Sequence, residues 1–160
     1  MEFRIGTGID IHPWGEGRKF CLGGIKIPYS SGLVGHSDGD VLIHALMDAL
    51  LGSMGLGDIG EHFPPSDEKL KGISSLRLLR KVMKLVREKK GEVINVDATI
   101  MLEEPKITPY KEKIKWVLSK ELRIPPSCIN IKATTCEGLG FVGRNEGVVS
   151  IVSVMVKKND

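Results

Sequence analysis

A chain of 160 residues, 41% of them hydrophobic, is long enough to bury one core without disulfides or a structural metal. The net charge of +3 and the aromatic content of 5% argue against a nucleic-acid partner, because basic and aromatic residues are not interleaved along the chain. The three cysteines lack the spacing of a disulfide framework or of a cysteine zinc site. We therefore expect a single domain, residues 1–160.

No segment has the character of a membrane span or a targeting peptide. The longest nearly apolar run, residues 41–54, is interrupted by His44 and Asp48 and is shorter than the ~20 residues that cross a bilayer. Residues 1–20 lack a basic segment followed by an apolar core and a cleavage site. These features predict a cytoplasmic protein with no membrane partner.

The first predicted element is a strand over about residues 3–12, which contains the glycine-rich stretch GTGIDIH. A dinucleotide-binding loop would place a helix after these glycines. Alternating apolar and polar residues instead continue to Pro13, which is typical of a strand. Successive strand side chains point to opposite faces, so Asp10 and His12 share one face. Such pairs are common, and this pair alone does not establish a metal site.

Hairpin-like segments at residues 20–28 precede a helix predicted over residues 38–54. On this helix Asp40, His44 and Asp48 recur every four residues and form one polar stripe on an otherwise apolar surface. A lone histidine in this position is more often a hydrogen-bonded core residue. Together with Asp10 and His12 of the first strand, however, His44 completes a set of three ligands that suits Zn²⁺ with an open fourth position.

Two further segments flank this helix. The segment GHSDGD, residues 35–40, offers backbone amides, the Ser37 hydroxyl and the positive end of the helix dipole, which favour a phosphate. Simple helix capping is the alternative, and it accounts for Ser37 but not for the neighbouring His36. After the helix, residues 57–67 form a turn-rich loop, and long ordered loops are often functional.

The remaining predicted elements are a helix at residues 74–90, a strand at 93–103, a helix at 109–122, and strands at 129–135 and 147–157. This order predicts an α+β fold in which helices pack on one face of a mixed β-sheet.

Capping residues indicate where the later helices begin and end. Ser74 or Ser75 suits the start of the second helix, and Gly91 suits its end. Thr108 followed by Pro109 suits the start of the third helix, since proline is favoured in the first turn.

Taken together and in this order, several stretches resemble the 2-C-methyl-D-erythritol 2,4-cyclodiphosphate synthase family of non-mevalonate isoprenoid biosynthesis. The resemblance covers essentially the whole chain and is carried by GTGIDIH, LGGIKIPY, GHSDGDVLIHALMDALLG, LGDIGEHFP, EEPK and KATTCEGLGFVGRNEG. It implies an α+β fold and a homotrimer with active sites between subunits. It also implies a phosphorus-oxygen lyase that cyclises 4-diphosphocytidyl-2-C-methyl-D-erythritol 2-phosphate to 2-C-methyl-D-erythritol 2,4-cyclodiphosphate and releases CMP.

The resemblance assigns metals and catalytic residues. By this resemblance Asp10, His12 and His44 hold zinc, and Glu137 binds a second divalent ion, Mg²⁺ or Mn²⁺, that the substrate diphosphate largely carries. His36 and Thr135 are implied to stabilise the transition state.

The resemblance also implies the substrate-binding residues. Those expected around the methylerythritol and its phosphates are His36, Ser37, Asp58, Ile59, Gly60, Phe63, Pro64, Pro65, Ser66 and Asp67. Those expected at the cytidine and diphosphate pocket are Leu102, Glu103, Glu104, Pro105, Lys106, Ile107, Thr108, Thr134, Thr135, Cys136 and Glu137. Those expected at a central cavity of the trimer, where an isoprenoid diphosphate is an added hypothesis, are Phe141, Arg144 and Glu146.

Two features depart from the family pattern, and two other functions stay open. Cys136 stands where threonine is more common, and Glu103 and Glu104 add negative charge beside the nucleotide pocket. One alternative function is a non-catalytic zinc- or phosphate-binding module. The other is a trimer whose apolar central cavity binds isoprenoid diphosphates. Release of CMP distinguishes the enzyme from a binding module.

Overall fold

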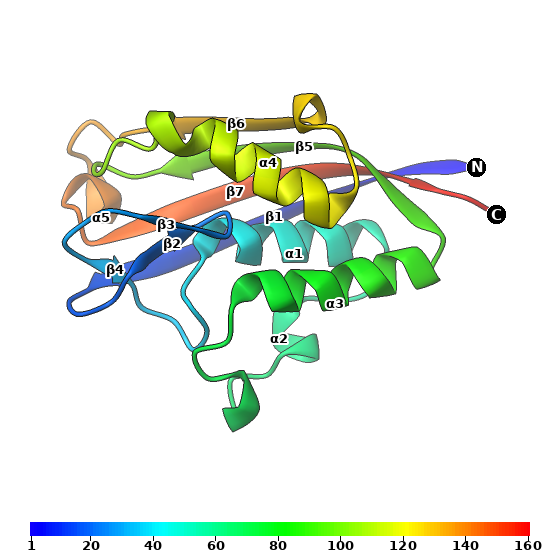
Figure 1. Cartoon of the computed structure of the whole chain (residues 1–160), viewed down its shortest axis with the longest axis horizontal. Helices are drawn as coiled ribbons and strands as arrows, with labels where there is room; N and C mark the ends of the chain where they lie inside the picture. Colours follow the sequence, from blue (N-terminus) through cyan, green and yellow to red (C-terminus); the bar gives the residue numbers. More distant parts are fainter.

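The computed structural model describes all residues, 1–160, and contains a five-stranded sheet in the order β4-β1-β7-β5-β6 (Figure 1). The strands are β1 (Glu2–Gly15), β4 (Gly32–Leu33), β5 (Gly91–Met101), β6 (Ile129–Thr134) and β7 (Gly147–Lys158). The pair β5 and β6 is parallel, and the other three pairs are antiparallel. The sheet is therefore mixed, as predicted.

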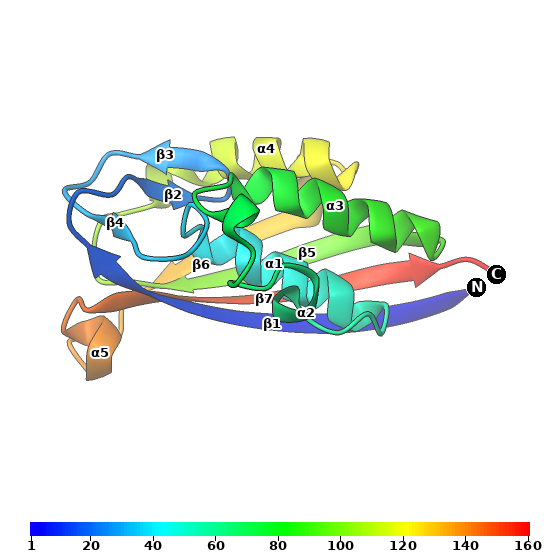
Figure 2. The same ribbon diagram turned by 90° about the horizontal axis from the view of Figure 1, so that it is seen from below.

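Helices cover one face of this sheet. The helices are α1 (Val41–Ser53), α2 (Ile59–His62), α3 (Ser75–Glu88), α4 (Lys111–Leu122) and α5 (Gly140–Gly143). The short 3-10 turns are Glu68–Leu70, Thr108–Tyr110 and Pro126–Cys128, and a separate hairpin pairs β2 (Phe20–Leu22) with β3 (Ile25–Ile27). Figure 2 shows α1, α3, α4 and the hairpin on one side of the sheet and α5 on the other. The α+β prediction is confirmed, and the long helices lie on one face, whereas the short α5 does not.

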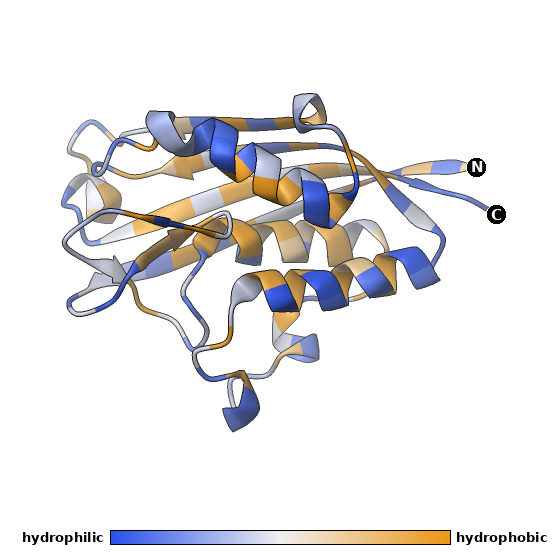
Figure 3. Ribbon diagram, viewed as in Figure 1, coloured by the Kyte–Doolittle hydropathy of each residue, from blue (hydrophilic) through white to orange (hydrophobic).

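The central helix α1 packs unusually close to β1. A Cβ atom added to Gly6 would lie 1.8 Å from the carbonyl oxygen of Ala49, and one added to Gly8 would lie 1.9 Å from that of Ala45. Both glycines are therefore required for the close approach of the strand to the helix. Between sheet and helices lies one continuous core of 36 buried hydrophobic residues, and α1 is apolar along almost its whole length (Figure 3).

The predicted elements lie where expected, but their ends differ. Helix α1 begins at Val41 rather than at residue 38, because Asp40 is its N-cap and the Asp40 carboxylate accepts a hydrogen bond from the Ile43 amide at 3.0 Å. The prediction that Gly91 ends the second helix is wrong. Gly91 is instead the first residue of β5, and Lys90, with φ of 60°, makes the turn before it.

The third long helix also starts later than predicted. Thr108 lies in a 3-10 turn and provides no side-chain cap, and α4 begins at Lys111. The short elements β4, α2 and α5 were not predicted. In the whole chain, no helix is long and apolar enough to cross a membrane.

The sheet face opposite the helices, called the open face below, exposes apolar side chains. On β1 the exposed fractions are 60% for Phe3, 71% for Ile5, 57% for Ile9 and 53% for Ile11. The strand register places Ile9 beside Ile151 of β7, so the apolar surface extends across two strands. A contiguous apolar surface of this kind is typical of a contact between proteins.

Candidate metal centre and flanking pockets

Three ligand-type side chains converge between β1 and α1. Asp10 Oδ2 lies 2.8 Å from His12 Nε2 and 3.1 Å from His44 Nδ1. The two imidazole nitrogens are 3.1 Å apart. Strand periodicity places the first two residues on the face that α1 covers, and the close packing of α1 brings the third to them. The structure thus brings together three residues that could hold a metal ion.

The outer nitrogens of both imidazoles are held by hydrogen bonds. His12 Nδ1 donates to the carbonyl oxygen of Val34 at 2.6 Å, which leaves a lone pair on Nε2 of a neutral ring. His44 Nε2 lies 2.9 Å from the Ser37 hydroxyl oxygen and 3.0 Å from that of Ser75. With a proton on that nitrogen, Nδ1 also presents a lone pair to the centre. Lone pairs of two rings and a carboxylate at such distances repel one another unless a cation lies among them.

The spacing of the three ligand atoms suits a small four-coordinate ion. Ligand atoms bound to a tetrahedral Zn²⁺ at about 2 Å would lie roughly 3.3 Å apart, so the measured separations require only a slight widening. All three ligand residues also line a cavity, so an ion held by them would have room for a further ligand there. The donor set therefore fits a metal site that keeps one position open.

The charges within this centre shift the pKa of two of its groups. Burial raises the pKa of Asp10, but hydrogen bonds from His12 and His44 outweigh burial and hold the pKa below its ordinary value. Burial lowers the pKa of His12, whereas the hydrogen bond and charge of Asp10 raise it above its ordinary value. Without a metal, His12 therefore keeps its proton to a higher pH than an ordinary histidine. A metal ion must therefore compete with a proton.

The centre opens into a cavity of about 230 Å³, called the metal pocket below. Its lining residues are Asp10, His12, His36, Ser37, His44, Met47, Ile59, Gly60, Phe63, Pro65, Leu70 and Leu78. Polar ligands thus form one wall and apolar side chains the other. Such a cavity can hold a charged group at the ligands and shield the rest of a small molecule from water.

The loop after α1 is tied to this pocket by hydrogen bonds. Asp48, from the polar stripe of α1, accepts from the amide of Ile59 at 2.8 Å. Asp58 caps α2 by accepting a backbone amide at 3.0 Å, and His36 Nε2 lies 3.2 Å from the carbonyl oxygen of Asp67. The residues predicted around the methylerythritol that do not line the metal pocket are Asp58, Pro64, Ser66 and Asp67.

The N-terminus of α1 is occupied by a carboxylate. The buried Asp40 side chain accepts from the amides of Gly23, Gly24 and Ile43 at 3.0, 2.8 and 3.0 Å. Burial, together with the nearby charge of Asp38, raises the pKa of Asp40. Asp40, rather than Ser37, therefore caps this helix, and a phosphate beside His36 and Ser37 stays a prediction.

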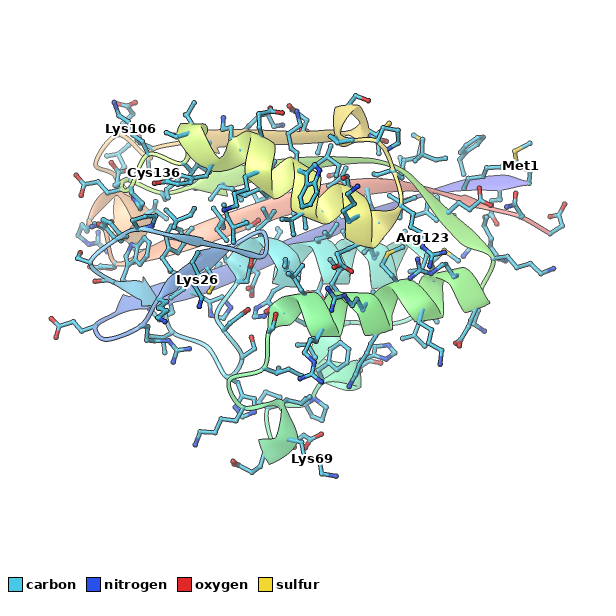
Figure 4. All side chains as sticks on the ribbon, viewed as in Figure 1. Met1, Lys26, Lys69, Lys106, Arg123 and Cys136 are labelled. Atoms are coloured by element: carbon cyan, nitrogen blue, oxygen red, sulfur yellow. The ribbon has the colours of Figure 1, made fainter.

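A second cavity, called the edge pocket below, has a volume of about 290 Å³ and lies where β5 and β6 end. Its lining residues are Leu102, Glu103, Pro105, Lys106, Ile107, Thr108, Ala133, Thr134 and Thr135. The parallel pairing of the two strands brings their carboxyl ends to one edge of the sheet. Figure 4 shows Lys106 and Cys136 at the same end of the molecule, with Met1 at the opposite end. Every lining residue of the edge pocket except Ala133 was predicted for the cytidine and diphosphate pocket.

Three further predicted residues lie beside the edge pocket without lining it. The Cys136 amide donates to the Glu103 carboxylate at 2.7 Å. Cys136 and Glu103, which both depart from the family pattern, are therefore in contact through the Cys136 backbone. Glu104 accepts from the Tyr29 hydroxyl at 3.4 Å. The exposed Glu137 accepts from the Thr135 hydroxyl at 3.4 Å.

The two pockets have no lining residue in common. His36 lines the metal pocket, and Thr135 lines the edge pocket, so one chain does not bring the two predicted catalytic residues into one cavity. Phe141 and Arg144 lie on the α5 segment beyond the open face, and the Arg144 guanidinium pairs with Glu146 at 2.8 Å.

Several pocket residues were missed by sequence reasoning. Met47 lies one helical turn after His44, so the helical spacing could have indicated it. Leu70 and Leu78 come from a 3-10 turn and from α3, and only tertiary packing places them in the metal pocket. Ser75 was considered only as a helix cap, although its hydroxyl contacts His44.

The chain is thus an α+β protein with a mixed sheet and a candidate metal site, made by Asp10, His12 and His44, between its first strand and its central helix. Residues 3–157 match the model of the YgbB family. A curated relative from Clostridium acetobutylicum, named 2-C-methyl-D-erythritol 2,4-cyclodiphosphate synthase, is 56% identical over 147 residues, which are 92% of this chain and 95% of the relative. The chain belongs to this family, and the resemblance seen in the sequence is confirmed.

Solved structures give the same result. The bifunctional IspDF from Campylobacter jejuni is 44% identical with a TM-score of 0.95, and the match covers 99% of this chain but 43% of that chain. A structure of 2C-methyl-D-erythritol-2,4-cyclodiphosphate synthase in a CDP-bound form is 37% identical with a TM-score of 0.88 and is covered over its full length, 100%, by 96% of this chain.

Proposed function

We propose that this protein converts 4-diphosphocytidyl-2-C-methyl-D-erythritol 2-phosphate to 2-C-methyl-D-erythritol 2,4-cyclodiphosphate and CMP, as a phosphorus-oxygen lyase of non-mevalonate isoprenoid biosynthesis. The observation that carries the proposal is the convergence of Asp10, His12 and His44 at one wall of the metal pocket. The names of its relatives and the CDP bound to a related structure support the substrate class.

The reaction needs no nucleophile from the protein. The 2-phosphate oxygen attacks the β-phosphorus, the new P–O bond closes the ring, and the bond to the CMP oxygen breaks. Two anionic phosphates must approach in line, so the task of the chain is orientation and neutralisation of charge. A bound Zn²⁺ would supply positive charge to neutralise phosphate oxygens. Asp10, His12 and His44 are the residues that would hold it.

Other residues of the metal pocket orient the reacting part of the substrate. His36 and Ser37 line the pocket beside the ligand set, where an imidazole and a hydroxyl can donate hydrogen bonds to phosphate oxygens. Ile59 and Phe63 form part of the apolar wall, which suits the carbon skeleton of methylerythritol and excludes water.

The edge pocket suits the nucleotide end of the same substrate. Lys106, Thr134 and Thr135 offer a cation and two hydroxyls for a cytidine diphosphate. The exposed carboxylate of Glu137 lies beside them and would help to hold a second divalent ion, Mg²⁺ or Mn²⁺, since hard cations prefer oxygen ligands.

We infer a homotrimer with active sites between subunits. One substrate must reach both the metal pocket and the edge pocket, yet within one chain these are separate cavities. Pairing the metal pocket of one subunit with the edge pocket of the next would complete the site. Burial of the apolar open face between subunits would supply hydrophobic stabilisation for that assembly.

A second candidate function is binding of an isoprenoid diphosphate at the centre of the trimer. The α5 segment with Phe141 and Arg144 lies on the side of the sheet that carries the open face (Figure 2). An apolar chain would contact the open face, and the diphosphate would pair with the guanidinium. Arg144→Ala should weaken binding of a prenyl diphosphate, and unchanged binding would count heavily against this function.

Phosphorus NMR tests the main proposal directly. Purified protein, the diphosphocytidyl substrate and Mg²⁺ should give CMP together with a cyclic diphosphate. Absence of both products with zinc, magnesium and manganese present in turn would overturn the proposal. Zinc binding without release of CMP would leave only a metal-binding module.

A further inference from the structure

A chain of hydrogen bonds leads from the metal centre to a carboxylate outside it. His44 Nε2 lies 3.0 Å from Ser75 Oγ, and Ser75 Oγ lies 2.5 Å from Asp38 Oδ1. The Ser75 backbone amide also donates to Asp38 Oδ2 at 2.9 Å. Ser75 is completely buried and His44 is 7% exposed, so solvent does not compete for the bond between them, whereas Asp38 at the far end is half-buried.

The directions of these bonds follow from the chemistry of their ends. An ionised carboxylate only accepts, so the Ser75 hydroxyl donates its proton to Asp38. The Ser75 oxygen then accepts from His44, which places the imidazole proton on Nε2. The lone pair of that ring therefore lies on Nδ1, the nitrogen that is 3.1 Å from both Asp10 Oδ2 and His12 Nε2.

We propose that Asp38 and Ser75 form a positioning relay that holds His44 in its Nε2-protonated tautomer, with Nδ1 directed at the metal. The inference rests on the proposed metal role of His44 and adds two residues that the proposed function does not use. A carboxylate behind a ligating imidazole fixes the ring orientation and raises its basicity. Here the hydroxyl of Ser75 transmits the effect of the carboxylate.

Ser37 contacts the same nitrogen but has a different role. Its hydroxyl oxygen lies 2.9 Å from His44 Nε2, and its other side-chain neighbour is the Ser75 hydroxyl at 3.4 Å. No carboxylate takes its proton, so the Ser37 hydroxyl can donate to a ligand in the metal pocket that it lines. Ser75 therefore holds the imidazole and leaves Ser37 available for the substrate.

The carboxylate end of the relay is itself fixed in place. Asp38 Oδ1 accepts from the Asp40 amide at 3.1 Å, and the Asp38 amide donates to the carbonyl oxygen of Ile73 at 3.1 Å. Ser74, the N-cap residue of α3, makes no side-chain cap bond, and Asp38 provides a carboxylate to the first turn instead. The relay thus connects the start of α3 to the imidazole on α1.

Zinc affinity of the whole protein is the first test, measured by competition with a chromophoric chelator. Ser75→Ala removes the hydroxyl, and zinc should bind about 10–100-fold more weakly. Asp38→Asn removes the negative charge and one hydrogen-bond acceptor and should also weaken zinc binding. Ser74→Ala is the matched control, because the same atoms are deleted one residue away, and its zinc affinity should equal that of the wild type.

The second test is nitrogen NMR of the imidazoles in metal-free protein, at a pH where the rings are neutral. The relay predicts His44 protonated on Nε2 in the wild type and in Ser74→Ala, and a mixture of tautomers in Ser75→Ala. A purely structural role would lower thermal stability without changing the tautomer. If Ser75→Ala does not fold, Asp38→Asn supplies both measurements.

The outcomes separate this inference from the proposed function. Wild-type tautomer and zinc affinity in both relay variants would overturn the relay while leaving the metal site intact. A wild-type protein that binds no zinc would instead overturn the metal assignment itself.

Discussion

The metal pocket and the edge pocket differ in how far a single chain completes them. In the metal pocket, His12 and His44 are held by hydrogen bonds on both sides of their rings, and the apolar wall includes the buried residues Met47, Leu70 and Leu78. In the edge pocket, the side chains of Lys106, Thr134 and Thr135 are exposed. Contacts within the chain therefore hold the ligands of one pocket in place, whereas the polar side chains of the other are exposed.

This difference matches the chemistry that each pocket would perform. A metal site must hold several mutually repelling donors in place, which requires a rigid frame of strand, helix and second-layer hydrogen bonds. A nucleotide pocket needs hydroxyls, amides and a cation at the end of a sheet, and these can stay solvated until the ligand displaces water. Changes in the two pockets should therefore have separable effects.

The largest expected effect is that of His44→Ala. Loss of one of three ligands should abolish zinc binding. Turnover should fall by more than ~100-fold, the loss typical of removing a residue that only hydrogen-bonds a metal ligand. Assembly should persist, because His44 lies away from the open face. Metal content, CMP release and light scattering measure the three quantities. Turnover at the wild-type rate with no bound zinc would contradict the metal assignment.

A packing change should damage the metal pocket and spare the edge pocket. Gly8→Ala places a methyl group 1.9 Å from the carbonyl oxygen of Ala45, so β1 and α1 must separate. We expect the free energy of unfolding to fall by about 1–3 kcal/mol in urea titrations, together with weaker zinc binding. Gly52→Ala is the matched control on α1, because its new methyl group meets no atom within 4 Å. That control should stabilise the helix by up to about 1 kcal/mol.

Lys106→Ala should instead damage the edge pocket and spare the metal pocket. Removing a cation that bonds a phosphate should cost about 1.5–3 kcal/mol of binding free energy, so CDP affinity falls roughly tenfold or more. Zinc content should not change, because Lys106 does not line the metal pocket. Calorimetric titration with CDP and Mg²⁺ measures the effect, and Lys113→Ala, an exposed lysine of α4, is the control. An equal loss in both variants would show only a general charge effect.

The metal pocket alone should respond to mild acidification through His12. The pKa of His12 is raised, so the ring keeps its proton to a higher pH than an ordinary histidine and zinc must displace that proton. Zinc affinity should therefore fall as pH decreases through the raised pKa, by about tenfold per pH unit for one proton. Calorimetry in buffers of different ionisation enthalpy should detect proton release on zinc binding. Zinc affinity that is constant across this range would contradict the competition.

The sequence predicted the long elements because their periodicity extends over many residues. The strand around GTGIDIH and the helix with His44 are of this kind, and their side-chain spacing also predicted which polar groups share a face. The short elements α2 and α5, with four residues each, are too short to show a period. Helix ends shifted because capping is decided by contacts such as that of Asp40 with the β2–β3 hairpin.

The candidate site was predictable where local spacing or family resemblance defined it. Asp10 and His12 follow from strand alternation, and the edge pocket follows from the resemblance together with two strands that end side by side. The contribution of α3 was not predictable, because Leu78 and Ser75 reach the metal pocket and its ligand only through tertiary packing. Separate metal and edge pockets within one chain were already implied by the resemblance, which expects active sites between subunits.

The smallest expected effect concerns the departure at Cys136. Its backbone amide, not its thiol, donates to the Glu103 carboxylate, so a different side chain at this position should preserve that bond. Cys136→Thr, which introduces the residue more common in the family, should change CDP affinity by no more than about twofold, as is usual for surface substitutions. Glu103→Ala removes the acceptor and should have the larger effect in the same titration. A large loss in Cys136→Thr with none in Glu103→Ala would show that the thiol, rather than the amide, contributes to the edge pocket.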